Sequence, residues 1–365
     1  MSRSSWLAPV VAVAFLLVLA APGAAEEEGK GERLSKLSIH GFLTQAYGLA
    51  HDNQYAGIPT DSGTTDLRKA ALQFRYDATP RDAIVLQLQH QRWGHTTSED
   101  LQNVDDVSVD WAFYQHTFAN DLWVRAGKVT IPFGVFNQVR DVGTILPFYR
   151  IPTTVYRDGA LQIETVDGFA AGKTFSLGGV DLETAAYYGE TRLDAGMFSA
   201  DLRNVIGGQV ALVAFDSRLR ASVSYYQGDG VQDSAPNVKE DWSAPLYSLE
   251  LRLGRVRLIG EWVDYKHDPV KTGGKYALVS VAATDKLTVS GMYQKDDFQF
   301  GGFRLDDFEE DTAVSLAWAF RPDLVLRLEH HLYEGFGVEF PEGVVPDGPG
   351  PWKGDHSILS LSASF

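Results

Sequence analysis

Basic side chains gather in one part of the chain, between residues 122 and 160. They are Arg125, Lys128, Arg140, Arg150 and Arg157. The acidic residues of this part are Asp141 and Asp158, so a small excess of positive charge is left. Charges act most strongly inside a narrow passage of low dielectric constant. We therefore expect these five basic residues to guide ions electrostatically and not to take part in catalysis.

The same part of the chain contains an unusually apolar connection, residues 130–160. A surface loop is normally polar, but this one holds Pro132, Phe133 and Gly134 and further aromatic residues. Such a loop needs an inner wall to pack against, and a loop folded into a barrel narrows the lumen to a size filter. We expect Pro132, Phe133 and Gly134 to form the inward bend, Gly134 above all because glycine tolerates unusual backbone angles. The five basic residues would then lie at the pore constriction.

Short turns and long connections alternate along the rest of the chain. The short ones, rich in Gly, Pro, Asn or Asp, are 77–82, 119–121, 177–179, 216–218, 254–255, 284–286 and 321–323. The long ones are 50–65, 95–106, 130–160, 190–203, 228–243, 266–274, 296–310 and 334–355. Seven short and eight long connections separate sixteen strands. The sequence thus predicts an all-β fold, a 16-stranded antiparallel transmembrane β-barrel with an inward-folded third loop.

Apolar and polar residues alternate within the expected strands, as when Ile84, Leu86 and Leu88 alternate with glutamines. A soluble β-sandwich would show the same period of two. Strands of about 10 residues, the asymmetry of turns and loops, and few charges on the apolar face favour a barrel in lipid. Lys173, which shares a face with Phe169 and Phe175, is an exception. We expect five tryptophans to anchor the barrel at the membrane interfaces, namely Trp93, Trp111, Trp123, Trp262 and Trp318.

The two ends of the chain indicate export. Residues 1–25 have a basic start, an apolar stretch and small residues before Glu26, which predicts a signal peptide. Residues 26–36 are expected to form a short periplasmic lead-in and residues 37–365 the outer-membrane β-barrel. The chain has no cysteine, and its net charge of −16 argues against nucleic acid as a partner.

Other groups give weak signals for chemistry. Adjacent His330 and His331 would point to opposite faces of a strand and so could not share a metal ion. The acidic run 306–311 lacks the spaced ligands and central glycine of a calcium loop. No Gly-x-Ser-x-Gly elbow is present, and no catalytic constellation stands out by its spacing. We expect no catalytic residue, no metal and no cofactor.

Two motifs resemble known families. The alternating last residues, which end at Phe365, resemble the final strand of bacterial outer-membrane barrels, where this strand is the assembly signal. Gly127-Lys128 followed by Pro132-Phe133-Gly134, within a sixteen-strand plan, resembles trimeric porins of the phosphate-selective porin O/P type. The resemblance implies a homotrimer in the bacterial outer membrane, with lipid, lipopolysaccharide and the barrel assembly machinery as partners. It also implies that the third loop forms the constriction.

The sequence therefore predicts a porin for passive diffusion of small hydrophilic solutes, with a weak preference for anions. Expected lumen positions carry both signs, with Arg75, Arg125, Arg220, Arg252, Arg257 and Arg327 against Asp110, Asp181, Glu183, Glu250, Glu261 and Glu329. Either the throat is weakly basic, or the wall charges pair off and size alone filters solutes. The alternatives are a channel specific for phosphate or organic anions, and an outer-membrane barrel enzyme or adhesin.

Overall fold

The computed structural model describes residues 36–51, 57–60, 62–94, 107–156, 163–194, 199–267, 269–336 and 350–365. The predicted signal peptide, the lead-in up to residue 35 and Arg157 lie outside the described residues.

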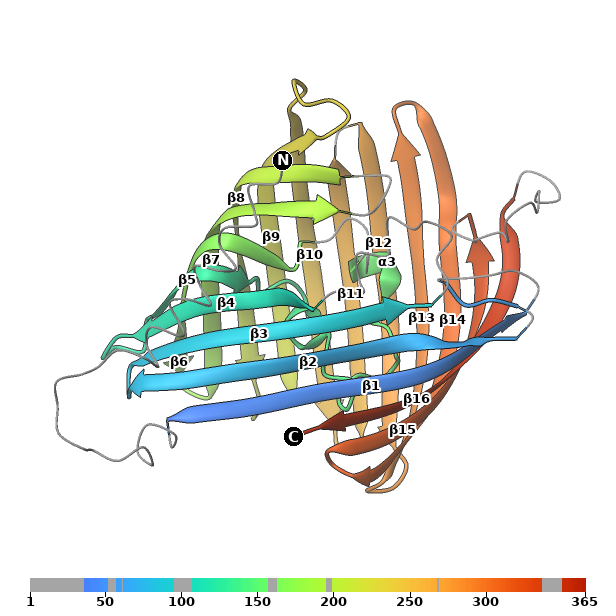
Figure 1. Cartoon of the computed structure of the whole chain (residues 1–365), viewed down its shortest axis with the longest axis horizontal. Coiled ribbons are helices and arrows are strands. Elements are labelled where there is room, and N and C mark those ends of the chain that lie inside the picture. Colours follow the sequence, from blue (N-terminus) through green and yellow to red (C-terminus); the bar gives the residue numbers. More distant parts are fainter. Residues whose placement is uncertain are drawn as a thin grey trace.

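Sixteen antiparallel strands close into one barrel, as the sequence predicts (Figure 1). The strands are β1 (Leu37–His51), β2 (Thr64–Thr79), β3 (Asp82–Trp93), β4 (Ser108–Thr117), β5 (Trp123–Thr130), β6 (Thr165–Leu177), β7 (Val180–Asp194), β8 (Ser199–Ala214), β9 (Leu219–Gln232), β10 (Glu240–Leu253), β11 (Val256–His267), β12 (Val270–Ala282), β13 (Leu287–Phe300), β14 (Phe303–Arg321), β15 (Leu324–Gly335) and β16 (Trp352–Ser364). Pairing of β1 with β16 closes the ring, and Gly41 and Phe365 exchange two backbone hydrogen bonds of 3.0 Å at this seam. Closure satisfies backbone polar groups that lipid could not.

The seven predicted short turns all join neighbouring strands, but four predicted long connections are strand over more than half of their length. Residues 190–203 belong mostly to β7 and β8, and residues 228–243 mostly to β9 and β10. Only two residues separate β11 from β12 and β13 from β14. The apolar alternation stops before these strands end, so their polar outer ends resemble loops in the sequence. The strands therefore extend beyond the apolar band.

The two faces of the sheet differ as expected for a barrel in lipid. Large apolar side chains such as Leu249 and Trp262 are 45% and 52% exposed on the outer face, whereas Gln87 and Glu261 are buried on the inner face. The short turns mark the periplasmic rim of such a barrel. Lys173 lies on the outer face, five residues before Gly178, with its ammonium 5.2 Å from the Phe175 ring centroid.

Four of the five tryptophans have described side chains, and these divide between the two faces, which corrects the expectation that all five anchor the barrel in the membrane; the side chain of Trp93 lies outside the described part. Trp262 and Trp318 are exposed outward. Trp111 is buried, and Trp123 pairs with Gly172 at a register that faces the lumen. Alternation in the sequence predicts the face of an aromatic residue only where the strand is regular. A β-bulge shifts the alternation, as it does between Gln87 and Leu88 where β3 pairs with β4.

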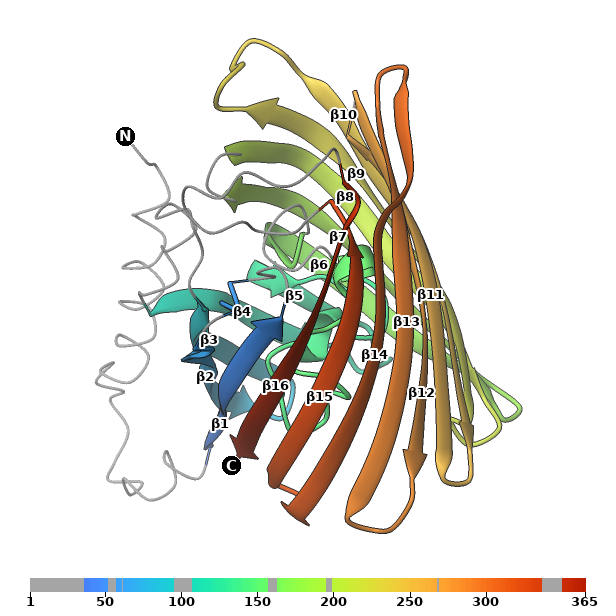
Figure 2. The ribbon, with the colours of Figure 1, turned by 90° about the vertical axis from the view of Figure 1, so that its right-hand side faces the viewer.

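The third connection carries two short helices, η3 (Asn137–Val139) and α3 (Thr153–Tyr156). In two views at right angles α3 lies within the ring of strands (Figure 1 and Figure 2). No helix among the described residues is long and apolar enough to cross a membrane.

Candidate functional site

The described part of the third connection, residues 131–156, is called the constriction loop below. Pro132, Phe133 and Gly134, the residues expected to form the inward bend, stand near its start. Gly134 has φ 68°, and a Cβ at this position would collide with the Tyr156 hydroxyl and the Glu261 carboxylate. Phe133 is fully buried, with its ring centroid 5.5 Å from that of Tyr226 on β9. The bend is therefore packed against the inner wall of the barrel.

Glu261, on the inner face of β11, holds this end of the loop. Its carboxylate accepts hydrogen bonds from the Val135 amide (2.9 Å) and from the hydroxyls of Tyr156 (2.5 Å), Tyr276 (2.6 Å) and Ser248 (2.5 Å). Burial, and next the nearby Glu261 charge, raises the pKa of the Tyr156 hydroxyl well above its usual range. Tyr156 therefore stays a donor to Glu261, while its oxygen accepts the Val135 and Phe136 amides.

The middle of the loop is bound to the wall four strands further along the ring. The Arg327 guanidinium on β15 donates to the carbonyls of Gly143 (3.0 Å) and Leu146. The Tyr149 amide donates to the Glu329 carboxylate at 2.8 Å. The loop leaves the wall at β5 and returns to it at β6, and β11 to β15 lie in the far part of the ring from these two strands, so these bonds hold the loop across the lumen.

Three carboxylates, Asp110, Asp141 and Glu164, meet where the loop leaves the wall. Their oxygens lie within 4.8 Å of one another, a spacing that a metal ion could fill. The Gln87 amide already donates to Asp110 (2.7 Å) and Asp141 (3.1 Å), and Arg140 donates to Glu164 (3.0 Å). The group fits a loop anchor better than a site for solute.

The predicted basic residues do not come together. Arg140 is 7% exposed and paired with Glu164, so little of its charge reaches the lumen. Arg150 is half-buried in the loop. Arg125 faces the lumen near the periplasmic rim, where its guanidinium lies 4.7 Å from the Phe113 ring centroid and donates to Gln115.

Lys128 lies on the outer face instead of the lumen that the sequence pattern predicted for it. It pairs with Asp167, which alternates with Phe169, a side chain 65% exposed on the outer face. Its ammonium donates to the Val109 carbonyl at 2.7 Å. Arg125 and Lys128 are three residues apart, and strand residues at that spacing point to opposite faces.

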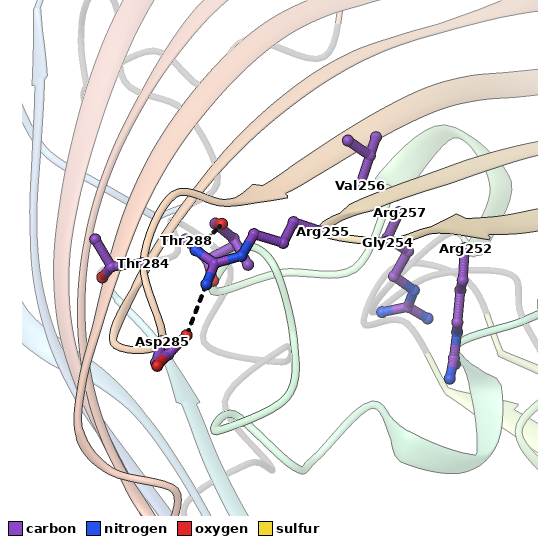
Figure 3. A pocket seen from close by; sticks show the side chains of 9 residues that line it. Arg252, Gly254, Arg255, Val256, Arg257, Thr284, Asp285 and Thr288 are labelled. Atoms are coloured by element: carbon purple, nitrogen blue, oxygen red, sulfur yellow. Dashed lines mark hydrogen bonds and ion pairs between the residues drawn. The ribbon is translucent and has the colours of Figure 1, made fainter.

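A basic cavity lies between the constriction loop and the periplasmic turns, and it is called the vestibule below. One part, of about 300 Å³, lies at the turns of β10–β11 and β12–β13 (Figure 3). A second part, of about 280 Å³, reaches the loop at residues 144–147. Its charged lining residues are Arg252, Arg255, Arg257, Lys286, Arg327 and Asp285.

Positive charge exceeds negative charge in the vestibule. Glu250 binds both Arg252 (2.7 Å) and Arg257 (2.8 Å), and Asp285 binds Arg255 (3.0 Å). Arg327 is 1% exposed and bonded to the loop, so four cations remain against these two carboxylates, a net charge of 4 − 2 = +2. Figure 3 shows Arg252 and Arg257 projecting side by side from neighbouring strands.

The vestibule was only partly visible in the sequence. Alternation placed Arg252, Arg257 and Arg327 in the lumen, and the structure agrees. Arg255 and Lys286 lie in or beside turns, where alternation gives no face. The vestibule residues of β10 to β13 share one signal in the sequence, which is that they lie close to short turns. The pairing of β10 to β13 brings these turns together at one rim of the barrel.

The described strands define a class of fold, the closed sixteen-stranded antiparallel β-barrel. No family model and no curated protein matches the chain. Solved structures do match. They include the anion-selective porin from Comamonas acidovorans (13% identity, 90% of this chain and 99% of that chain, TM-score 0.59). OmpF of Salmonella typhi (10%, 90% and 97%, 0.59) and a loop L8 deletion mutant of OmpT of Vibrio cholerae (12%, 90% and 99%, 0.56) are also similar.

At these identities the likeness shows the fold alone. With its apolar outer face, the barrel belongs in the bacterial outer membrane. The narrower likeness to phosphate-selective porins finds no support in a family model.

Proposed function

We propose that this chain is a porin for passive diffusion of small hydrophilic solutes, with a weak preference for anions. The observation that carries the proposal is the constriction loop, which starts at β5 and is held at the far part of the ring by Glu261 on β11 and by Arg327 and Glu329 on β15. Bonds from side chains to loop backbone fix the width of the passage, so solutes are selected by size.

The vestibule supplies the anion preference in this proposal. Its net charge of +2 lies directly below the loop, where a narrow passage strengthens electrostatic attraction. Elsewhere on the wall, arginines are closely paired, as Arg220 is with Glu183 at 2.5 Å. The two alternatives for the wall charges therefore apply in different regions. Along most of the wall, positive and negative charges cancel in pairs, whereas in the vestibule a positive charge is left over.

A channel specific for phosphate or organic anions is the second candidate. It is favoured by the cluster of arginines in the vestibule, since guanidinium groups bind phosphate and carboxylate oxygens in a bidentate manner. Such a channel would show saturable current and block by phosphate, whereas a general porin would show neither.

We further propose that the chain forms a homotrimer and that the barrel assembly machinery recognises Phe365. The outer face would contact lipopolysaccharide. Phe365 is exposed at the periplasmic rim with its ring over Gly41, accessible to a partner during assembly.

Planar-bilayer recording and liposome swelling with sugars of increasing size test the proposed function. A porin gives stepwise conductance and a swelling rate that falls steeply with sugar size. Absence of both current and swelling from a correctly folded protein would leave the barrel enzyme or adhesin instead.

A further inference from the structure

Two histidines lie directly opposite each other on the inner face of β15 and β16, and they are called the histidine stack below. His331 and His356 are Cα partners in this strand pair, and their ring centroids lie 4.4 Å apart with 12° between the ring planes. Both side chains are buried. Histidine is the side chain that most readily changes its charge near neutral pH. The histidine stack is therefore a place where protons can act on the inner wall.

His331 stands between two carboxylates. Its Nδ1 atom lies 2.9 Å from Asp311 on β14, and its Nε2 atom lies 3.5 Å from Glu329 on its own strand. Gln294 on β13 also donates a hydrogen bond to Asp311, at 2.8 Å. Negative charges at this range favour the protonated ring, which presents a donor on each nitrogen. His331 therefore carries a positive charge.

The neighbours of His356 favour its neutral form instead. Ala50 of β1 is its Cα partner on the side away from His331. The charges that act on His356 are those of His331, Arg150 and His330, which are positive when protonated. Like charges disfavour a second proton so close to the first. At neutral pH the histidine stack therefore holds one positive charge, on His331.

The other charged groups of the surrounding strands lie further along the wall. Arg327 is two inward-facing rows nearer the periplasmic rim, where its charge acts on Glu329. Glu309 and Asp296 lie two inward-facing rows nearer the outer ends of β14 and β13. The described residues that β1 and β16 present on this face beside the stack are uncharged. The balance of charge at the stack thus depends on Asp311, Glu329 and the two histidines.

Three consecutive residues of the constriction loop meet the histidine stack. The Phe148 ring lies edge-on to His331, with centroids 5.6 Å apart and 67° between the planes. The Tyr149 amide donates to the Glu329 carboxylate that faces His331. The charge of Arg150 acts on His356. Because both rings of the stack are buried, water gains access to them when residues 148–150 move off the wall.

We propose that the histidine stack is a proton-operated hold on the constriction loop, a regulation that rests on the proposed function. With one charge on the stack, residues 148–150 stay on the wall through Phe148 and Tyr149. A second proton on His356 places like charges on stacked rings and beside Arg150, so this segment of the loop leaves the wall.

The direction of the response to pH follows from water access. In the released state His356 meets water, where a histidine takes up a proton below about pH 6.5. In the held state the ring stays neutral, so the released state binds one more proton. The hold is therefore complete well above this pH and is lost as the pH falls below it.

A spin label at Ile145→Cys tests the hold without relying on ion current. Ile145 is 56% exposed in the loop, and the chain has no cysteine of its own, so the label has a single site. Electron paramagnetic resonance of the folded barrel in mild detergent is recorded from about pH 7.5 to about pH 4.5. Because release takes up one proton, we expect the ratio of mobile to immobile label to rise by up to about tenfold for each pH unit below about pH 6.5.

Two variants of the labelled protein separate the histidine stack from other acid effects. His356→Phe keeps a ring in the stack but takes up no proton, so its label should stay immobile throughout. His330→Gln is the matched control, since His330 faces outward beside Ser357, and its label should respond like that of the protein with the label alone. An acid response that persists in His356→Phe overturns the proposal, and so does a label that stays immobile in all three proteins. Resistance of the folded barrel to detergent at room temperature confirms that each variant is folded.

Planar-bilayer recording separates this hold from the proposed function. Release should widen the passage, so the conductance of the unaltered protein should rise and become noisy in acid, and that of His356→Phe should not. A label that becomes mobile in a protein without current at any pH would support the hold and remove the porin. Steady current with an immobile label would support the porin and remove the hold.

Discussion

The residues that hold the constriction loop, among them Glu261 and Arg140, differ from the vestibule in their balance of charge, although both groups lie on the inner face of the same barrel. Around Glu261 and Arg140 nearly every charge meets a partner at hydrogen-bond distance. In the vestibule the carboxylates Glu250 and Asp285 are too few for the four surrounding cations, Arg252, Arg255, Arg257 and Lys286. Paired charges therefore hold the loop, and the unbalanced charges remain for passing ions.

This difference separates size selection from charge selection. The loop sets the width of the passage through bonds to its backbone, which do not depend on what passes. The vestibule sets the preferred sign of the ion and leaves the width unchanged. Variants in one region should therefore alter one property and spare the other.

The largest effect is expected from Glu261→Ala. It removes the acceptor of the Val135 amide and of three hydroxyl groups, and each buried donor left unpaired costs about 1–3 kcal/mol. The loop end should come away from β11, so single-channel conductance should rise and become noisy. Glu183→Ala, which removes a wall carboxylate paired with Arg220 outside the loop, is the control. If both variants conduct like the unaltered protein, Glu261 does not hold the constriction.

A change in ion preference with unaltered width is expected from Arg252→Gln/Arg257→Gln. The variant lowers the vestibule charge from +2 to 0 while Glu250 remains. The interaction energy of two unit charges about 8 Å apart in water is about 0.5 kcal/mol, so anion preference should fall about twofold for each arginine removed. Reversal potentials in a salt gradient measure this, and liposome swelling with sugars checks that size selection is retained. An unchanged reversal potential would remove the vestibule from the ion pathway.

Ionic strength should affect the two regions differently. The Debye length falls from about 10 Å at 0.1 M salt to about 3 Å at 1 M. Anion preference, which depends on exposed vestibule charges, should therefore decline as salt rises, whereas the sugar size limit should stay constant. Preference that persists undiminished in 1 M salt would point to ion binding at a desolvated site, as in the phosphate-specific alternative.

The smallest effect on selectivity is expected from Arg140→Gln/Glu164→Gln. The pair is bonded at 3.0 Å and largely buried, so its removal takes no net charge from the lumen. Reversal potential should not move, although single Arg140→Gln should lower thermal stability by leaving Glu164 beside Asp110 and Asp141. A clear loss of anion preference in the double variant would contradict this account, because it would show that the charge of Arg140 acts on ions at the constriction.

The barrel was largely predictable from the sequence because a period of two and short polar turns are local signals. Strand number, faces and the bend at Gly134 follow from them. The lengths of β7, β13 and β14 do not, since their outer ends lose the apolar alternation that marks a strand in lipid.

The site was less predictable because it depends on pairing across the barrel. Arg140 looks like a free cation until Glu164 is placed beside it, and Lys128 looks like a lumen residue until its register with Asp167 is known. Arg255 and Lys286 gain their role only when the turns of β10–β11 and β12–β13 meet at one rim.

The sign of the reversal potential of the unaltered protein in a potassium chloride gradient tests the central claim most directly. The chain as a whole carries a net charge of −16, so the field of the entire protein would favour cations. The account predicts a weak preference for chloride, because the vestibule lies on the pathway and the acidic residues of the outer strand ends do not. A preference for potassium would contradict it.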